Sequence, residues 1–126
     1  MDDWCYEVPA GGPSSRLDQS QRTSGSRLVQ SEEVARRELL EEVGGTTTDL
    51  RYVGRFYTSN SISNEVAYVY LATGVELGAA RPEPTELMEL RLLPVEEALR
   101  MARKGEISDG PSALALLWCE NLLHCL

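Results

Sequence analysis

One short acidic segment constrains this chain more than any other feature, because it combines helix signals with converging carboxylates. It spans residues 31–45 and reads SEEVARRELLEEVGG. Ser31 is a good N-cap residue, and acidic residues follow it in the first turn, where the helix dipole favours negative charge. Gly44 and Gly45 supply a stop signal. The sequence therefore predicts a helix over residues 31–43.

Three glutamates converge on one side of this helix. Glu38, Glu41 and Glu42 are spaced i, i+3 and i+4, so their side chains are neighbours. Like charges so placed cost roughly 0.2–0.5 kcal/mol per pair in an isolated helix. A divalent cation would remove this cost, and carboxylate oxygens suit magnesium, manganese or calcium better than zinc. The spacing alone leaves two interpretations open, a metal site and a solvated acidic face.

The apolar stripe of the helix lies beside the glutamates rather than opposite them. It consists of Ala35, Leu39, Leu40 and Val43. One side of the helix is therefore expected to pack on a core while the neighbouring side lines the edge of a cleft.

Composition bounds the class of protein. The chain has 126 residues, 42% of them hydrophobic, which predicts one modest domain with a core. No apolar run approaches the ~18 residues of a transmembrane helix, and the start does not resemble a signal peptide. The net charge of −8 argues against nonspecific binding to nucleic acid. The three cysteines show no CxxC spacing, which favours reduced thiols and a cytoplasmic location.

Hydrophobic patterns predict short strands interleaved with helices, an α/β (α+β) sandwich of helices against a small mixed sheet. The expected strands are residues 4–9, 50–57, 66–73 and 87–93, and the expected further helices are 95–104 and 111–123. Residues 13–30 break this pattern, with five serines, three arginines and a single acid. That composition predicts a flexible loop or insert.

Several segments, in this order, resemble a Nudix hydrolase. They are Ala10-Gly11-Gly12, the helix RRELLEEVGG, the strand and loop GRFYTSNSISNE, and the later GEISDGPSALALL. More narrowly, they are similar to the ADP-ribose pyrophosphatase branch, which hydrolyses nucleoside diphosphate sugars to a nucleoside monophosphate and a sugar phosphate. The resemblance implies a Nudix-type α/β/α sandwich and a single Nudix-like domain over residues 1–126, with the insert at 13–30.

The resemblance also implies a metal site. The family's metal-binding glutamates fall on Glu38 and Glu42, with Glu41 as a further ligand or proton acceptor. The alanine whose carbonyl binds metal falls on Ala10. The implied cofactor is Mg²⁺, with Mn²⁺ as a substitute.

The glutamate that positions or deprotonates the attacking water best matches Glu86, and Glu83 and Glu89 are close rivals. Arg37 resembles the family arginine that orients a box glutamate, and it could equally be an ordinary ion-pair partner of a glutamate one turn away, Glu33 or Glu41. The loop that contacts the sugar-phosphate part of the substrate resembles residues 59–65, which contribute Ser59, Ser61 and Glu65.

Two departures from the family pattern are visible. Counting back from Arg37, the position of the family's first box glutamate is Val29, which can neither bind metal nor accept a proton. Only nine residues precede Ala10, so the chain looks like a truncated or divergent member without the usual first strands. The N-terminal arm that usually forms the homodimer is absent from this sequence, and dimerisation stays open.

These observations support two hypotheses of different classes. The first is a metal-dependent nucleoside diphosphate sugar hydrolase, favoured by the four glutamates assigned above. The second is a catalytically impaired Nudix-like module that binds a nucleotide or a protein, favoured by Val29 and the short N-terminus. A serine or cysteine triad has little support, because the single histidine, His124, lies near the chain end without a nucleophile motif.

Overall fold

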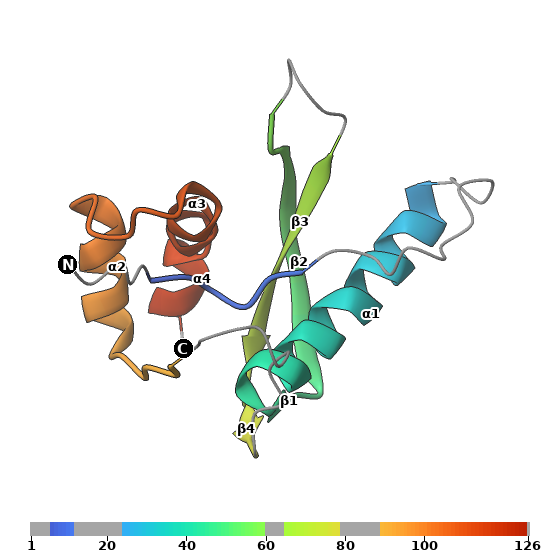
Figure 1. Ribbon diagram of the computed structural model, residues 1–126, viewed down its shortest axis with the longest axis horizontal. Coiled ribbons are helices and arrows are strands. Elements are labelled where there is room, and N and C mark those ends of the chain that lie inside the picture. The colour runs from blue at the N-terminus through green and yellow to red at the C-terminus, as the bar shows by residue number, and fades with distance from the viewer. Residues whose placement is uncertain (1–5, 12–23, 60–64, 79–88, 126) are drawn as a thin grey trace. The chain divides into compact units, whose positions relative to one another are not determined.

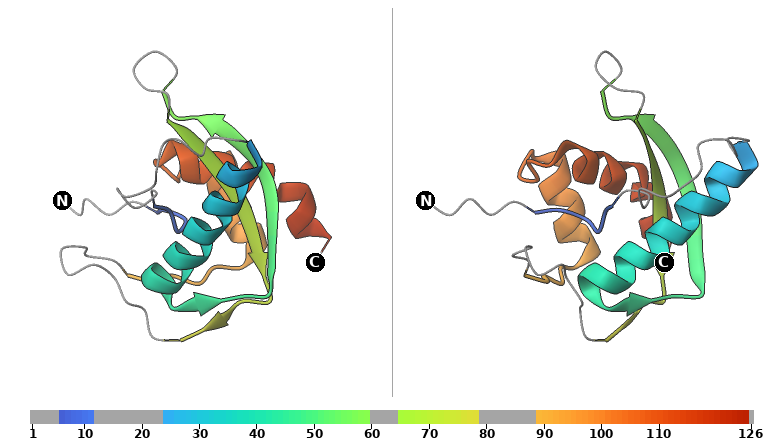
Figure 2. Two further views of the ribbon diagram at one scale, coloured as in Figure 1. Left: turned by 90° about the vertical axis from the view of Figure 1, so that its right-hand side faces the viewer. Right: turned by 45° about the vertical axis from the view of Figure 1, so that its right-hand side comes forward.

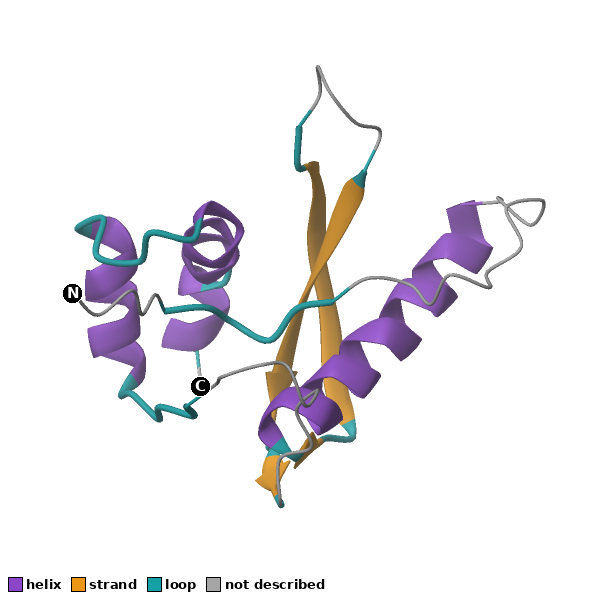
Figure 3. Ribbon diagram, viewed as in Figure 1, coloured by secondary structure: helices purple, strands orange, loops and turns teal. Residues whose placement is uncertain are grey.

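The computed structural model of the protein describes residues 6–11, 24–59, 65–78 and 89–125, and its helices and strands are drawn in Figures 1 and 3. The mixture of helices and strands confirms the predicted α/β class. Along the described chain the elements are α1 (Ser24–Val43), β1 (Gly45–Thr46), β2 (Asp49–Tyr57), β3 (Val66–Thr73), β4 (Glu76–Leu77), α2 (Val95–Arg103), α3 (Gly110–Trp118) and α4 (Glu120–His124).

The strands form two small sheets. β2 is the neighbour of β3, and these two strands match the predicted segments 50–57 and 66–73 to within one residue. β1 pairs with β4 in antiparallel fashion, with Gly45 opposite Leu77 and Thr46 opposite Glu76. No sequence pattern predicted this second pair, because two residues per strand are too few for an alternation to be recognised.

The chain forms two compact units. We call Met1–Val8, Val53–Val69 and Arg91–Leu126 the C-terminal unit, and Pro9–Tyr52 and Tyr70–Leu90 the carboxylate unit. The prediction of a single Nudix-like domain over residues 1–126 stays a prediction. Within the described residues, no helix combines the length and apolar character needed to cross a membrane.

The C-terminal unit has a core built by its helices. Helices α2 and α3 lie side by side in Figures 1 and 2. Leu99 of α2 is fully buried, and a cluster of Met101, Ala102 and Ile107 packs against apolar side chains of α3. The predicted helix 95–104 is confirmed, and Pro94, before its first residue, has φ fixed near the helical value.

The predicted helix 111–123 is present as two consecutive helices, α3 and α4, separated by Cys119. Asp109 caps α3, since its side chain accepts a hydrogen bond from the Ser112 backbone N–H at 3.1 Å. On the same unit, Trp118 packs on β2, where a Cβ on Gly54 would lie 3.1 Å from the indole ring. The absence of a side chain at Gly54 therefore allows the ring to approach the strand.

Two predicted strands are wrong over the described residues. Residues 6–9 are not a strand, because the Val8 N–H donates to the side-chain oxygen of Ser112 at 3.0 Å instead of joining a ladder. Residues 89–93 are not a strand either, and three leucines among them are exposed. Their alternation resembled a strand, but no neighbouring strand pairs with them in the part of the chain that the structure describes. Residues 4, 5, 87 and 88 lie outside the described residues.

The predicted start of the acidic helix is also wrong. α1 begins at Ser24, and Ser31 lies inside the helix, where its hydroxyl is 2.7 Å from the Tyr70 hydroxyl. Residues 24–30, which we expected to belong to a flexible loop, are therefore helical. Residues 13–23 lie outside the described residues, so the flexibility expected there stays a prediction.

The end of α1 is as predicted. Gly44 has a φ of 68°, a conformation that favours glycine, and its N–H bonds to the Leu40 carbonyl at 2.9 Å. Gly45 is buried, and a Cβ there would lie 2.9 Å from Val75 and 3.0 Å from Leu39. The two glycines therefore let α1 end directly against the β1–β4 pair, as Figure 2 shows.

Candidate active site

The candidate site is built on the last two turns of α1. Glu38 and Glu42 are one turn apart on the same face of this helix, as their spacing predicted. The Glu38 side chain is only 16% exposed, whereas the Glu41 side chain is 41% exposed. Glu38 is therefore enclosed by protein, and Glu41 faces largely toward solvent.

The Ala10–Gly11 turn encloses Glu38 and contacts Glu42. The Ala10 backbone N–H donates to the Glu42 carboxylate, Oε2, at 3.0 Å. A Cβ on Gly11 would lie 2.1 Å from Cδ of Glu38, so a larger residue here would force the carboxylate to move. The structure thus brings together Ala10, Glu38 and Glu42, which are up to 32 residues apart in sequence.

Arg37 lies between two of the carboxylates. Its Nη2 is 3.5 Å from Oε1 of Glu38, and its Nε is 4.0 Å from Oε1 of Glu41. The sequence left two roles open for Arg37, orienting a box glutamate or pairing with a glutamate one turn away. The contact with Glu38 agrees with the first role, and the contact with Glu41 agrees with the second. Opposite charge at this distance offsets part of the repulsion among the glutamates.

The remaining predicted site residues are only partly described. Ser59 and Glu65 belong to the C-terminal unit, and the Glu65 carbonyl accepts the Thr58 N–H at 3.2 Å. Glu65 Oε2 also accepts the Thr58 hydroxyl at 3.3 Å, so Glu65 stabilises the base of this loop. Ser61 and Glu86 lie outside the described residues, as does Glu83. Glu89 is described and exposed.

The donor set of the site suits a hard divalent cation. Among the described residues no group of three or more His, Cys, Asp or Glu side chains is arranged to hold a metal. Mg²⁺ does not require such a cage, because it keeps several waters and is usually bound by one or two carboxylates together with substrate phosphates. Glu38 and Glu42, beside the backbone of Ala10, supply hard oxygen donors of that number and kind.

Cys119 and His124 lie in surroundings typical of structural and surface residues. Cys119 is buried, and burial raises the pKa of its thiol and disfavours the reactive thiolate. His124 is exposed, and its Nε2 lies 3.1 Å from Oε1 of Glu96 on α2. Both residues lie in the C-terminal unit, as expected for structural and surface positions.

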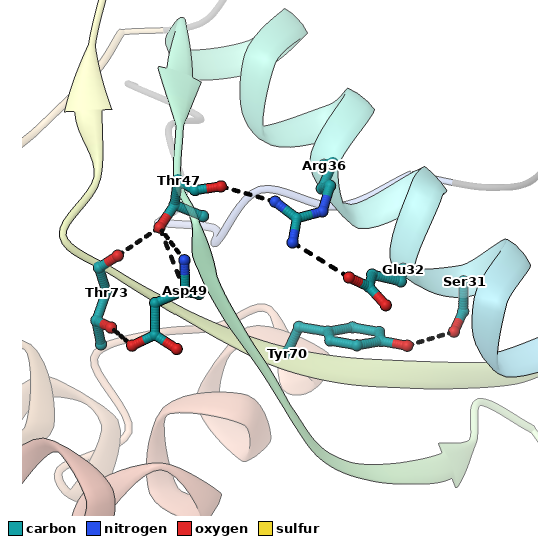
Figure 4. Close-up of polar contacts among 7 residues, drawn as sticks. All are labelled: Ser31, Glu32, Arg36, Thr47, Asp49, Tyr70 and Thr73. Atoms are coloured by element: carbon teal, nitrogen blue, oxygen red, sulfur yellow. Dashed lines mark hydrogen bonds and ion pairs between the residues drawn. The ribbon is translucent and has the colours of Figure 1, made fainter.

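Sequence reasoning missed a polar network at the other side of α1. Figure 4 shows that it links the helix, through Arg36, to Thr47, Asp49 and Thr73. The pairing of Arg36 with Glu32 could have been expected from their i,i+4 spacing. The contact with the Thr47 carbonyl at 2.7 Å has no sequence signal, because any backbone carbonyl can accept.

With this geometry established, comparison with known proteins identifies the family. Residues 27–115 match the model of the NUDIX domain, so the chain belongs to that family. The matched segment contains all but the first three residues of α1, all the described strands, α2 and most of α3. The resemblance inferred from the sequence motifs is therefore confirmed.

Three curated relatives carry the names of hydrolases or pyrophosphatases. The chain is 28% identical to ADP-ribose pyrophosphatase of Bacillus subtilis, over 90% of this chain and 56% of that protein. It is 28% identical to CMP-5'-(N-acetyl-N-hydroxy-3-aminopropyl)phosphonate hydrolase of Streptomyces rubellomurinus, over 90% of this chain and 50% of the relative. It is 34% identical to GDP-mannose pyrophosphatase of Salmonella arizonae, over 71% of this chain and 46% of the relative.

These names agree with the predicted Nudix hydrolase class and with the expected branch of pyrophosphatases that act on nucleoside diphosphate sugars. The chain spans about half the length of the curated relatives it matches.

Proposed function

We propose that this chain hydrolyses the pyrophosphate bond of ADP-ribose or a related nucleoside diphosphate sugar, giving a nucleoside monophosphate and a sugar phosphate. The observation that carries the proposal is the contact of the Ala10–Gly11 turn with Glu38 and Glu42. The names of two relatives, an ADP-ribose pyrophosphatase and a GDP-mannose pyrophosphatase, support the substrate class. The odd number of cysteines without CxxC spacing supports a cytoplasmic location.

The proposed cofactor is Mg²⁺, or Mn²⁺ in its place. Glu38, Glu42 and the carbonyl of Ala10 would hold it, with Glu41 as a further ligand. When bound, such an ion offsets the negative charge of the phosphates and makes a water molecule more acidic. This chemistry suits a pyrophosphate link, whose anionic oxygens repel an incoming nucleophile.

The protein's own groups have distinct roles in the proposed reaction. The Ala10 N–H fixes one oxygen of Glu42 by a hydrogen bond. Arg37 lies near both Glu38 and Glu41, and its positive charge offsets the repulsion between them. A water oxygen attacks phosphorus, the bridging phosphorus–oxygen bond breaks, and the bridging oxygen leaves with the departing phosphate. The proton of the water passes to a carboxylate, which we assign to Glu86. Glu86 lies outside the described residues, so this assignment stays a prediction.

The substrate's sugar-phosphate part is assigned to the loop that follows β2. Ser59, Ser61 and Glu65 are the proposed contacts, since serine hydroxyls can donate to and accept from sugar hydroxyls and a carboxylate can accept from them. Glu65 Oε2 accepts from the Thr58 hydroxyl, which holds this side chain at the base of the loop.

The test is AMP release from ADP-ribose at millimolar magnesium, with and without a chelator. We expect release by the wild type, loss of release with chelator, and a fall of about 10²-fold or more in Glu42→Gln. Glu33→Gln is the matched control, because Glu33 lies on the same helix and is exposed. A wild type that binds ADP-ribose without releasing AMP would favour the alternative, a catalytically impaired Nudix-like binding module, which Val29 already suggests.

A further inference from the structure

Helix α1 is tied to the rest of the carboxylate unit at two points upstream of its glutamates. One point is Arg36 and the other is Ser31, and Figure 4 shows both. Arg36 contacts the Thr47 carbonyl and Glu32, and Ser31 contacts the Tyr70 hydroxyl. These two points of contact matter because the carboxylates near the C-terminal end of α1 have little freedom to move.

Arg36 connects the helix to the turn that follows β1. Its Nη1 donates to the Thr47 carbonyl at 2.7 Å, while its Nη2 lies 3.1 Å from Oε1 of Glu32. Glu32 thus holds the guanidinium in the orientation that reaches Thr47. Because Glu32 lies on α1 itself, the contact with the Thr47 carbonyl is the one by which Arg36 joins the helix to another element.

Thr47 is itself held in place. Its hydroxyl donates to the Thr73 carbonyl at the end of β3 and accepts the Asp49 N–H at 3.0 Å. The Asp49 carboxylate in turn accepts the Thr73 hydroxyl. The carbonyl that Arg36 contacts therefore belongs to a turn fixed to two strands, not to a free loop.

The second point is the hydroxyl pair of Ser31 and Tyr70, whose oxygens are 2.7 Å apart. Tyr70 is a residue of β3, and its ring packs edge-on against Tyr52 with centroids 5.6 Å apart. Ser31 and Glu38 are separated by about two helical turns, so they share one face of α1 roughly 10 Å apart along its axis. The contact with Tyr70 therefore fixes the same face that carries the carboxylates.

The carboxylate end tolerates little displacement. Glu38 already fills the place of a Cβ on Gly11, so a movement of the helix toward the turn would force the Glu38 side chain to rearrange. The hydrogen bond from the Ala10 N–H to Glu42 is 3.0 Å long, and a movement of the carboxylate away from Ala10 by about 1 Å would break it. The donors of the proposed metal site thus keep their arrangement only if α1 neither slides along its axis nor rotates about it.

We propose that Arg36 and Tyr70 are positioning residues of the metal site, which hold α1 so that Glu38 and Glu42 meet the Ala10–Gly11 turn. This inference rests on the proposed function for its catalytic consequence. Neither residue contacts substrate or metal in this proposal. Their substitution should therefore change the arrangement of the donors without removing a donor.

The test uses Tyr70→Phe, Arg36→Met and the conservative Arg36→Lys. The first readout is the hydrogen-exchange rate of the Ala10 amide by NMR, which needs neither metal nor substrate. The second is Mn²⁺ affinity by calorimetry, and the third is kcat/KM for ADP-ribose. Tyr57→Phe and Arg103→Met are matched controls, since Tyr57 is exposed on β2 and Arg103 pairs with Glu120 in the C-terminal unit.

We expect faster Ala10 exchange and about tenfold weaker Mn²⁺ binding in Tyr70→Phe and Arg36→Met, the lower end of the range for groups that orient metal ligands. Arg36→Lys should recover part of both, because lysine can still donate to Thr47. The two controls should match the wild type in both readouts.

Folded variants with wild-type Ala10 exchange and wild-type Mn²⁺ affinity would overturn the proposal, even if their melting temperature fell. Should Arg36→Met fail to fold, the near-isosteric Tyr70→Phe decides by the same two readouts. A wild type that releases no AMP would reject the proposed function alone, because the Ala10 exchange comparison does not depend on catalysis.

Discussion

Replacing Gly11 with alanine should separate the stability of this protein from its metal binding. A Cβ at residue 11 would lie 2.1 Å from Cδ of Glu38, whereas ordinary contact begins at 3.4 Å, so one of the two groups must move by about 1.3 Å. The group that moves with less cost is the Glu38 side chain, since it is flexible and its far end makes the contact.

The cost to stability should be small. An off-rotamer Glu38 side chain costs about 0.5–1.5 kcal/mol, and its contact with Arg37 at 3.5 Å is partly exposed and worth at most about 1 kcal/mol. We therefore expect Gly11→Ala to lower the free energy of unfolding by about 1–2 kcal/mol. The functional cost should be much larger, because misplacement of a reacting group by about 1 Å can reduce rates roughly 10²-fold.

The measurements are urea unfolding, Mn²⁺ calorimetry and kcat/KM for ADP-ribose on the same preparations. Gly110→Ala is the control, because a Cβ there meets nothing within 4 Å and its φ is not positive. That variant should bind Mn²⁺ as the wild type does and should be equally or slightly more stable. Wild-type Mn²⁺ affinity and wild-type turnover in Gly11→Ala would refute the contact between the turn and Glu38.

Three further predictions concern other parts of the chain. Ser112→Ala should destabilise the fold by about 1–3 kcal/mol in urea unfolding, because Ser112 is 1% exposed and accepts a distant backbone N–H, while the exposed Ser108→Ala should have little effect. A hydrogen bond from Arg100 holds the pKa of Glu97 below its usual range. The pair therefore stabilises the fold at a pH above the usual pKa of glutamate. This contribution is lost as the pH falls through the lower pKa of the folded state. Arg100→Gln should return the Glu97 pKa toward its usual range in a carboxyl-carbon NMR titration, and an unchanged pKa would contradict the assignment. Glu86→Gln should lower kcat about 10²-fold or more with little change in substrate binding, and wild-type turnover would show that another carboxylate is the base.

The strands and the C-terminal helices were predictable because their signals are local. Alternating Val and Tyr residues mark β2 and β3, and the first helical turn of α2 follows Pro94. The Asp109 cap of α3 also has a sequence signal, an Asp two residues before a proline. Such features need no knowledge of distant residues.

The predictions were wrong where a residue distant in sequence determines the local structure. Ser31 has the chemistry of an N-cap, and only the position of Tyr70, 39 residues later, turns its hydroxyl into a tertiary contact. Val8 has the pattern of a strand, but its N–H bonds to Ser112, 104 residues away. Leu90 and Leu92 alternate suitably for a strand, yet a strand requires a partner that sequence periodicity does not reveal.

The site shows the same division. Its residue types were predictable from one motif, because helix geometry alone places Glu38 and Glu42 on one face. Their contact with the Ala10–Gly11 turn was expected only through the family resemblance, since nothing local connects residues separated by a serine-rich segment. The network around Thr47 was not expected at all, because it depends mostly on backbone groups that every residue carries.

The two consecutive arginines of α1 illustrate why the surrounding structure, and not the motif, determines the charge of the site. Adjacent residues on a helix point about 100° apart, so Arg37 reaches Glu38 and Glu41 while Arg36 reaches Glu32 and the Thr47 carbonyl. The positive charge of Arg36 is therefore directed away from the carboxylates. Among the described residues, Glu38, Glu41, Glu42 and Arg37 together then contribute a formal charge of −2. Had both arginines faced the glutamates, the formal charge would be −1 and the attraction for a divalent cation correspondingly weaker.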